Sequence, residues 1–207
     1  MVNLKLPNKL TMLRILLIPV MIVVWYIPFF RETMVFTTGE GFFNGLSLMM
    51  LIEFVIFALA SITDFFDGKI ARKRNLVTSF GKFADPLADK MLVFTAMTLI
   101  MVDVSRGGSW YWNIMPIWAF IVMLIREFMV SGIRMVVASK GTVIPAAKMG
   151  KWKTETTMFA LIFLFFLHTH IVVAIIGMSM MYVACLLTII SGIEYFINSK
   201  DVILESI

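Results

Sequence analysis

Residues 64–89 carry two groups of regularly spaced aspartates, in the pattern Asp64-x-x-Asp67-Gly68-x-x-Ala71-Arg72, then eight residues, then Gly81-x-x-x-Asp85-x-x-x-Asp89. At about 100° per residue, the first group falls on one face of a helix. The second group, spaced four residues apart, likewise shares one face of another helix. The polar segment 73–78 between them predicts a short turn. The sequence therefore predicts two closely joined helices whose four aspartates point toward one another.

Four carboxylates gathered in a poorly hydrated place predict a metal site. Ionised carboxylates repel one another there and stay charged only if cations join them. Two divalent hard cations would cancel the formal charge, and oxygen ligands of this kind suit Mg²⁺ or Mn²⁺. The small residues on the same face leave room for a bulky group, such as a phosphate, against the backbone. Helix capping explains one or two of the aspartates but not two face-aligned pairs.

The composition indicates an integral membrane protein. The chain has 207 residues, of which 60% are hydrophobic, and a mean hydropathy of +0.94. Soluble domains are usually about 45–50% apolar. The length suffices for about six spans of roughly 20 residues. The single Cys185 excludes a disulfide framework within the chain. We expect an all-α, polytopic membrane protein with six transmembrane helices, forming one domain over residues 1–207.

The order of apolar and charged segments predicts where these helices lie. We expect a short interfacial segment at residues 1–11, then spans at about 11–30, 42–71, 79–102, 115–138, 154–167 and 171–197. The second span exceeds the bilayer thickness, so its last two turns, which carry the first aspartates, should reach the membrane surface. A basic stretch follows the fourth span, at residues 140–153.

The distribution of basic residues predicts the orientation. Six spans place both termini on one side, and that side receives 16 of the 18 Lys and Arg residues; only Arg31 and Arg106 fall opposite. The positive-inside rule then places both termini and the four aspartates at the cytoplasmic face. The pair His168 and His170 falls on the far side, where interfacial placement is a better explanation than a metal site.

The spacing within residues 64–89 resembles the signature of the CDP-alcohol phosphotransferase family at every specified position. The resemblance implies that Asp64, Asp67, Asp85 and Asp89 bind two divalent cations, and that Asp89 is the general base toward the acceptor hydroxyl. It also implies that the cytidine diphosphate is seated by Gly68, Ala71, Arg72 and Gly81. Packing against another membrane helix is an alternative for the small residues, and both roles are compatible.

Two further regions resemble the branch of this family formed by phosphatidylglycerophosphate synthases. The acceptor-phosphate region 126–154 contains Arg126, Arg134, Lys151 and Lys153, and the N-terminal region contains Asn8, Thr11 and Arg14. The resemblance implies transfer of the phosphatidyl group of CDP-diacylglycerol to sn-glycerol 3-phosphate, with release of CMP, by a homodimer. The four basic residues are candidates for the dianionic acceptor. Snorkelling of the arginines and attraction of the lysines to anionic lipids are alternatives.

Several questions stay open at this point. Asn8 and Thr11 either contact the CDP group or cap the first helix. Within the family, inositol phosphate, serine or phosphatidylglycerol are alternative acceptors. From another class, an ion-coupled transporter would also carry intramembrane carboxylates, but near the bilayer midplane. We expect both substrates and membrane lipids as partners, no nucleic acid, and a bacterial plasma (inner) membrane location. Glu53 and Glu194 lie within spans and have no assigned role.

Overall fold

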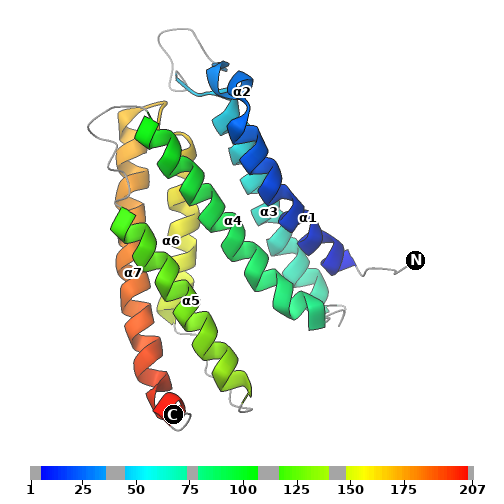
Figure 1. The fold of residues 1–207 in the computed structure, drawn as a ribbon, viewed down its shortest axis with the longest axis vertical. Coiled ribbons are helices and arrows are strands. Elements are labelled where there is room, and N and C mark those ends of the chain that lie inside the picture. The colour runs from blue at the N-terminus through cyan, green and yellow to red at the C-terminus, as the bar shows by residue number, and fades with distance from the viewer. Residues whose placement is uncertain (1–5, 36–44, 74–78, 107–116, 140–147, 205–207) are drawn as a thin grey trace. The chain divides into compact units, whose positions relative to one another are not determined.

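The computed structural model describes residues 6–35, 45–73, 79–106, 117–139 and 148–204, and their side chains at 10–35, 45–63, 84–103, 117–134 and 149–200. The helices in these ranges are α1 (Leu6–Tyr26), α2 (Pro28–Glu32), α3 (Leu48–Lys73), α4 (Ser79–Arg106), α5 (Ile117–Ser139), α6 (Lys148–Phe165) and α7 (Ile171–Leu204) (Figure 1). Apart from one antiparallel bridge between Met34 and Ser47, these ranges contain no strand. The all-α fold class is confirmed.

The helix boundaries differ from the expected spans for identifiable reasons. α1 begins at Leu6, so residues 6–11 form its first turns instead of a separate interfacial segment. It ends at Tyr26 because Pro28, which lacks an N–H group, begins the short α2. α6 begins at Lys148, inside the basic stretch. Lysine is a good helix former, so a helix continues through basic residues. Hydropathy indicates only the part of a helix that contacts lipid, and therefore it does not predict where the helix begins.

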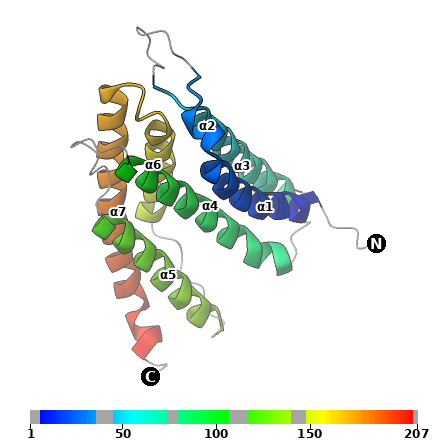
Figure 2. The same ribbon diagram turned by 45° about the horizontal axis from the view of Figure 1, so that its top comes forward.

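The first compact unit contains α1 to α4 together with the turn Phe165–Ile171. α1 packs on both α3 and α4, and Figures 1 and 2 show these three helices side by side. Ala84, Ala88 and Ala96 are buried on α4 at spacings of four and eight residues, which places them on one helical face. Because small residues let helix backbones approach closely, this face allows α1 to lie against α4.

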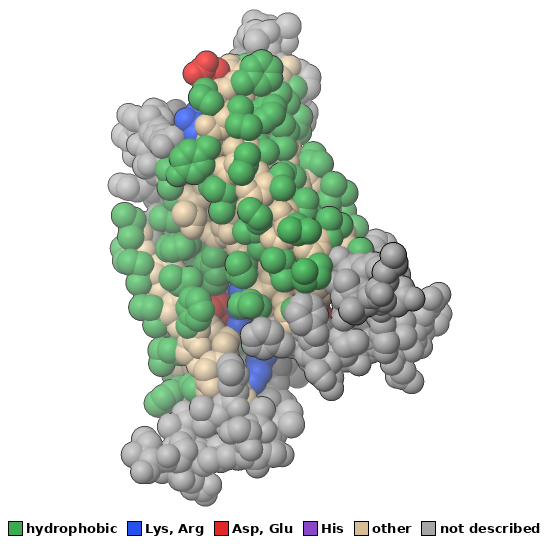
Figure 3. Space-filling model, turned by 45° about the vertical axis from the view of Figure 1, so that its right-hand side comes forward, with side chains coloured by type: hydrophobic (Ala, Val, Ile, Leu, Met, Phe, Trp, Pro, Cys, Tyr) green, Lys and Arg blue, Asp and Glu red, His purple; other side chains and the backbone are tan. Residues whose placement is uncertain are grey.

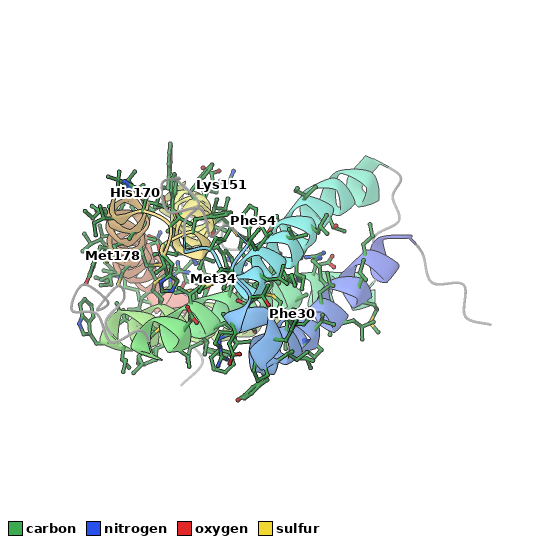
Figure 4. All side chains as sticks on the ribbon, turned by 90° about the horizontal axis from the view of Figure 1, so that it is seen from above. Phe30, Met34, Phe54, Lys151, His170 and Met178 are labelled. Carbon is green, nitrogen blue, oxygen red and sulfur yellow. The ribbon has the colours of Figure 1, made fainter. Side chains whose placement is uncertain are left out.

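Aromatic rings fasten the turn Phe165–Ile171 to α3. The ring of Phe54 lies 4.8 Å from that of Phe166 and 6.1 Å from that of Phe165, and Phe57 lies 5.5 Å from Phe165. Figure 4 marks Phe54 on α3. Gly45 also approaches this turn, since a Cβ atom there would lie 2.8 Å from the His168 carbonyl oxygen. The turn is therefore part of the first unit although it joins α6 to α7.

The second compact unit contains α5, α6 as far as Leu164, and α7 from Val172. Its core includes Ala160 and Leu161 on α6 and Ala174 and Ala184 on α7, all nearly inaccessible to solvent. Close packing continues at Gly177, where a Cβ atom would lie 2.9 Å from the Leu164 side chain. The absence of a side chain at Gly177 thus lets α7 lie close to α6.

Large hydrophobic side chains cover much of the described surface, as the face in Figure 3 shows. Leu16, Val23, Leu59, Phe128 and Leu186 are all more than half exposed. Among the described residues, one helical segment, Ile171–Lys200, is long and apolar enough to cross a membrane, with a mean hydropathy of 2.4. Leu10–Tyr26 and Leu48–Thr63 are shorter apolar segments. The apolar surface agrees with a membrane protein, and the count of six spans stays a prediction.

Candidate active site

The contact between α1 and α4 brings two predicted metal ligands to two residues of the N-terminal helix. Asp85 and Asp89 lie one turn apart on one face of α4, and Thr11 and Arg14 lie three residues apart on α1. The hydroxyl of Thr11 donates a hydrogen bond to Oδ1 of Asp85. The guanidinium of Arg14 donates through Nη1 to Oδ1 of Asp89, and its Nη2 lies 3.8 Å from Oδ1 of Asp85.

Burial differs sharply between the two sides of this contact. The Arg14 side chain is 1% exposed, whereas those of Asp85 and Asp89 are 41% and 37% exposed. A buried charge is costly unless a counter-charge and hydrogen bonds compensate it, and the two carboxylates supply both to Arg14. The guanidinium in turn limits the orientation of the two carboxylates from the side of α1. Asp85 and Asp89 are thus anchored on one side and accessible on the other.

The other predicted residues of this site have side chains outside the described part. They are Asn8, Asp64, Asp67, Gly68, Ala71, Arg72 and Gly81. Their backbones lie in the helices expected for them: Asn8 in the first turn of α1, Asp64 to Arg72 in the last turns of α3, and Gly81 in the first turn of α4. α4 begins at Ser79, the residue that the sequence predicts. The roles of these seven residues stay predictions.

The donor atoms on α4 fit a hard divalent cation. Carboxylate oxygens are the ligands that Mg²⁺ and Mn²⁺ favour, and those of Asp85 and Asp89 are partly exposed beyond their contacts with α1. Within the described side chains, no three His, Cys, Asp or Glu residues come together as a metal site. Because Arg14 offsets part of the charge of Asp85 and Asp89, a cation needs further ligands, for which Asp64 and Asp67 are the candidates.

A second charged cluster joins the three helices of the second unit. Glu127 on α5 accepts a hydrogen bond from Nη1 of its neighbour Arg126 at 2.8 Å and another from Nζ of Lys153 on α6. Nη2 of Arg126 donates to the hydroxyl of Ser191 on α7 at 2.9 Å. All three charged side chains are only 12–14% exposed. Two of the four predicted acceptor residues, Arg126 and Lys153, therefore meet through Glu127.

The other two predicted acceptor residues lie apart from this cluster. Lys151 is exposed on α6 and is marked in Figure 4. α6 turns by about 200° between residues 151 and 153, so the two lysines project from opposite faces. Arg134 is exposed, and its guanidinium lies 6.0 Å from the ring centroid of Tyr195. The structure thus separates a largely enclosed pair, Arg126 and Lys153, from an exposed pair.

Ser191 and Gly192 are site residues that the sequence pattern did not single out. A Cβ atom at position 192 would lie 2.9 Å from Cγ and 3.5 Å from Nε of Arg126, so the bare glycine leaves the space that the arginine side chain fills. The signal was a Ser-Gly pair within the last apolar span, since polar residues inside such spans usually have partners there. Which helix carries that partner is a matter of tertiary packing.

A third polar group lies at the other end of the first unit, about 20 Å along α4 from Asp89. Nε2 of His168 lies 2.9 Å from Oδ2 of Asp103. Glu53 on α3 is 1% exposed, and neither of its oxygens has a hydrogen-bond partner among the described residues. Arg31 donates to the Trp25 carbonyl oxygen at 2.7 Å. His168 is thus paired with an acidic residue.

Comparison with known proteins identifies the family. The profile of the CDP-alcohol phosphatidyltransferase family matches residues 4–190. The chain is 36% identical over 203 residues to the CDP-diacylglycerol–glycerol-3-phosphate 3-phosphatidyltransferase of Bacillus subtilis, covering 97% of this chain and 98% of that protein. Proteins of the same name from Rickettsia typhi and Salmonella choleraesuis are 40% identical over 194 residues and 34% identical over 201 residues. They cover 92% and 96% of this chain, and 94% and 97% of their own lengths. The chain belongs to the CDP-alcohol phosphatidyltransferase family.

Substitution of Gly192 tests the packing around Arg126. Gly192→Ala should lower the midpoint of thermal unfolding in detergent, because the new methyl group displaces the Arg126 side chain and weakens its bond to Ser191. Gly132→Ala on α5 is the matched control, since a Cβ atom there meets no described atom within 4 Å. Alanine in a helix is favoured over glycine by up to about 1 kcal/mol, so this control should keep or raise the midpoint. Equal midpoints for both variants would contradict the assigned role of Gly192.

Proposed function

We propose that this chain transfers the phosphatidyl group of CDP-diacylglycerol to sn-glycerol 3-phosphate, giving phosphatidylglycerophosphate and CMP. Family membership and the shared name of the relatives over nearly the full chain support this reaction. The observation that carries it is the anchored pair Asp85 and Asp89 on α4, in a motif of four aspartates. The largely enclosed cations Arg126 and Lys153 favour a phosphorylated acceptor over serine.

The donor half of the reaction is assigned to α1, α3 and α4. Asp64, Asp67, Asp85 and Asp89 would hold two divalent cations, Mg²⁺ or Mn²⁺, and a bound pair supplies charge stabilisation to the diphosphate as CMP leaves. Arg14 orients Asp89, and Thr11 orients Asp85, each from the side of α1. The cytidine diphosphate is seated by Asn8, Gly68, Ala71, Arg72 and Gly81. Thr11, predicted as a contact of the same group, is fully buried and supports Asp85 instead.

The chemical step moves one proton and exchanges one bond to phosphorus. The acceptor hydroxyl attacks the phosphorus next to the diacylglycerol, the bond from that phosphorus to the CMP oxygen breaks, and Asp89 takes the hydroxyl proton. Its contact with Arg14 fixes the direction of the carboxylate. A carboxylate beside cations is a modest base, so the position of the hydroxyl matters as much as the base.

The acceptor half is assigned to Arg126 and Lys153, with Arg134 at the exposed rim. Lys151 projects from the opposite face of α6, so contact with anionic lipid headgroups is the better proposal for it. An arginine fork and a lysine ammonium are the usual donors to a phosphate. Tyr195, whose ring faces Arg134, is 3% exposed, and its hydroxyl has no hydrogen-bond partner within the described part of the chain. A donor of this kind near the basic residues agrees with a polar ligand in the second unit.

The remaining features follow from the substrates. The lipid tails of CDP-diacylglycerol require a site open to the bilayer, whereas the nucleotide and the acceptor arrive from water. We propose a six-span protein of a bacterial plasma membrane that works as a homodimer, with the site and both termini at the cytoplasmic face. The single domain over residues 1–207 belongs to the same proposal.

The test of this function is CMP release by detergent-purified protein given CDP-diacylglycerol, with and without Mg²⁺, across a panel of acceptors. Release should need the metal and rise only with glycerol 3-phosphate. Asp64→Asn should abolish turnover with every acceptor, because it removes a proposed metal ligand. Release driven by another alcohol would keep the family and overturn the acceptor, and unchanged activity of Asp64→Asn would overturn the metal site.

Substitution of Asp89 tests the general base. Asp89→Asn should lower kcat by roughly 10²–10⁴-fold, the usual contribution of general base catalysis, and change KM for CDP-diacylglycerol much less. Steady-state kinetics with both substrates varied would measure the two effects. Asp85→Asn is the comparison, since Asp85 shares the face and the contact to α1 but has no assigned proton-transfer role. A rise in KM with kcat preserved in Asp89→Asn would rule out the base role.

A further inference from the structure

One oxygen of Glu127 lies where two cationic donors of the second unit converge. Oε1 accepts hydrogen bonds from Arg126 and from Lys153, which come from different helices. Neighbouring residues on a helix point about 100° apart, so Arg126 and Glu127 meet because both long side chains bend to the same place. Adjacency in the sequence does not by itself require this contact. Lys153 on α6 donates to the same Glu127 oxygen, so the contact forms part of a cluster that links two helices.

The donors around this oxygen are those of a phosphate site. Arg126 is held in place by its bond to Ser191 and by the fit of its side chain against Gly192, so its Nη1 has a fixed direction. Lys153 adds a point charge from α6. An arginine fork and a lysine ammonium together bind phosphate oxygens in many proteins. The Glu127 carboxylate oxygen therefore takes the position that an oxygen of a bound phosphate would occupy.

Charge balance sets the carboxylate and a phosphate against each other. The Glu127 carboxylate offsets one of the two positive charges of Arg126 and Lys153, and a low-dielectric site tolerates the smaller excess charge better. A phosphate dianion alone neutralises both cations. The dianion and the Glu127 carboxylate together would leave excess negative charge among side chains that are only 12–14% exposed. The two anions therefore compete for Arg126 and Lys153.

We propose that Glu127 is an internal counter-anion, which holds Arg126 and Lys153 in the free enzyme and gives them up to the phosphate of the acceptor. The inference rests on the proposed function and makes Glu127 a positioning residue for it. The reaction leaves this phosphate unchanged, because the attacking atom is a hydroxyl oxygen elsewhere on the acceptor. The product carries the same phosphomonoester, so the competing carboxylate weakens acceptor binding and speeds product release.

Glu127→Gln separates this role from simple support of the fold. The amide keeps the size of the side chain and an oxygen for Arg126 but loses the charge. KM for glycerol 3-phosphate should fall, by about tenfold for a change of about 1.4 kcal/mol, while KM for CDP-diacylglycerol stays the same. Inorganic phosphate, as a probe competing with the acceptor, should inhibit the variant at correspondingly lower concentration. A residue that only supports the fold would give unchanged or higher KM values.

The matched control is Glu155→Gln, the same exchange at an exposed position of α6 outside the cluster. It should change neither KM nor inhibition by phosphate. A second comparison covers the case in which the single variant folds poorly. Glu127→Gln combined with Lys153→Gln keeps the net charge of the native cluster, and its KM for the acceptor should lie below that of Lys153→Gln alone. An equal or higher KM in the double variant would overturn the inference.

The same data distinguish this inference from the proposed function. If Arg126→Ala and Lys153→Gln leave KM for glycerol 3-phosphate unchanged, the acceptor site itself lies elsewhere and both proposals fail in the second unit. If these two variants raise KM but Glu127→Gln does not lower it, the acceptor site stands and only the counter-anion role is rejected.

Discussion

Charges carried by apolar helices must be compensated inside the protein, and this constraint organises the chain. Arg14 is almost completely buried, and its charge is met by Asp85 and Asp89 across the contact between α1 and α4. Arg126 and Lys153 are met by Glu127 in the second unit. Leaving one partner of such a cluster unpaired costs several kcal/mol, so each cluster constrains which helices pack together.

The same compensation prepares the residues for chemistry. A carboxylate bound on one side by a buried arginine keeps its direction, and the Asp89 side chain stays 37% exposed to solvent. Arg126, which donates hydrogen bonds to both Ser191 and Glu127, is likewise oriented before any substrate arrives. Preorganised charges need little rearrangement when a phosphate binds or when charge develops on a leaving group. Stability and function therefore draw on the same contacts in this fold.

Local spacing accounts for what the sequence predicts well. The period of residues 64–89 indicates two helices, the start of α4 and the shared face of Asp85 and Asp89, because these are properties of one helix at a time. The helical period does not predict contacts between helices. Arg126, Arg134, Lys151 and Lys153 look equivalent in sequence, and only the packing of α5 against α6 and α7 separates the largely enclosed pair from the exposed pair. Helix ends also extend past the apolar spans, as at Lys148.

The early start of α6 has a consequence for the height of the protein in a bilayer. Lys151 and Trp152 are exposed on its first turns, next to the largely enclosed Lys153. Tryptophan settles at the boundary between acyl chains and headgroups, and lysine settles among anionic headgroups. In a membrane these two side chains would act as interfacial anchors that set the depth of α6. An α6 anchored in this way would hold Lys153 at the level of the lipid phosphates, where the proposed acceptor and the lipid donor would have to meet.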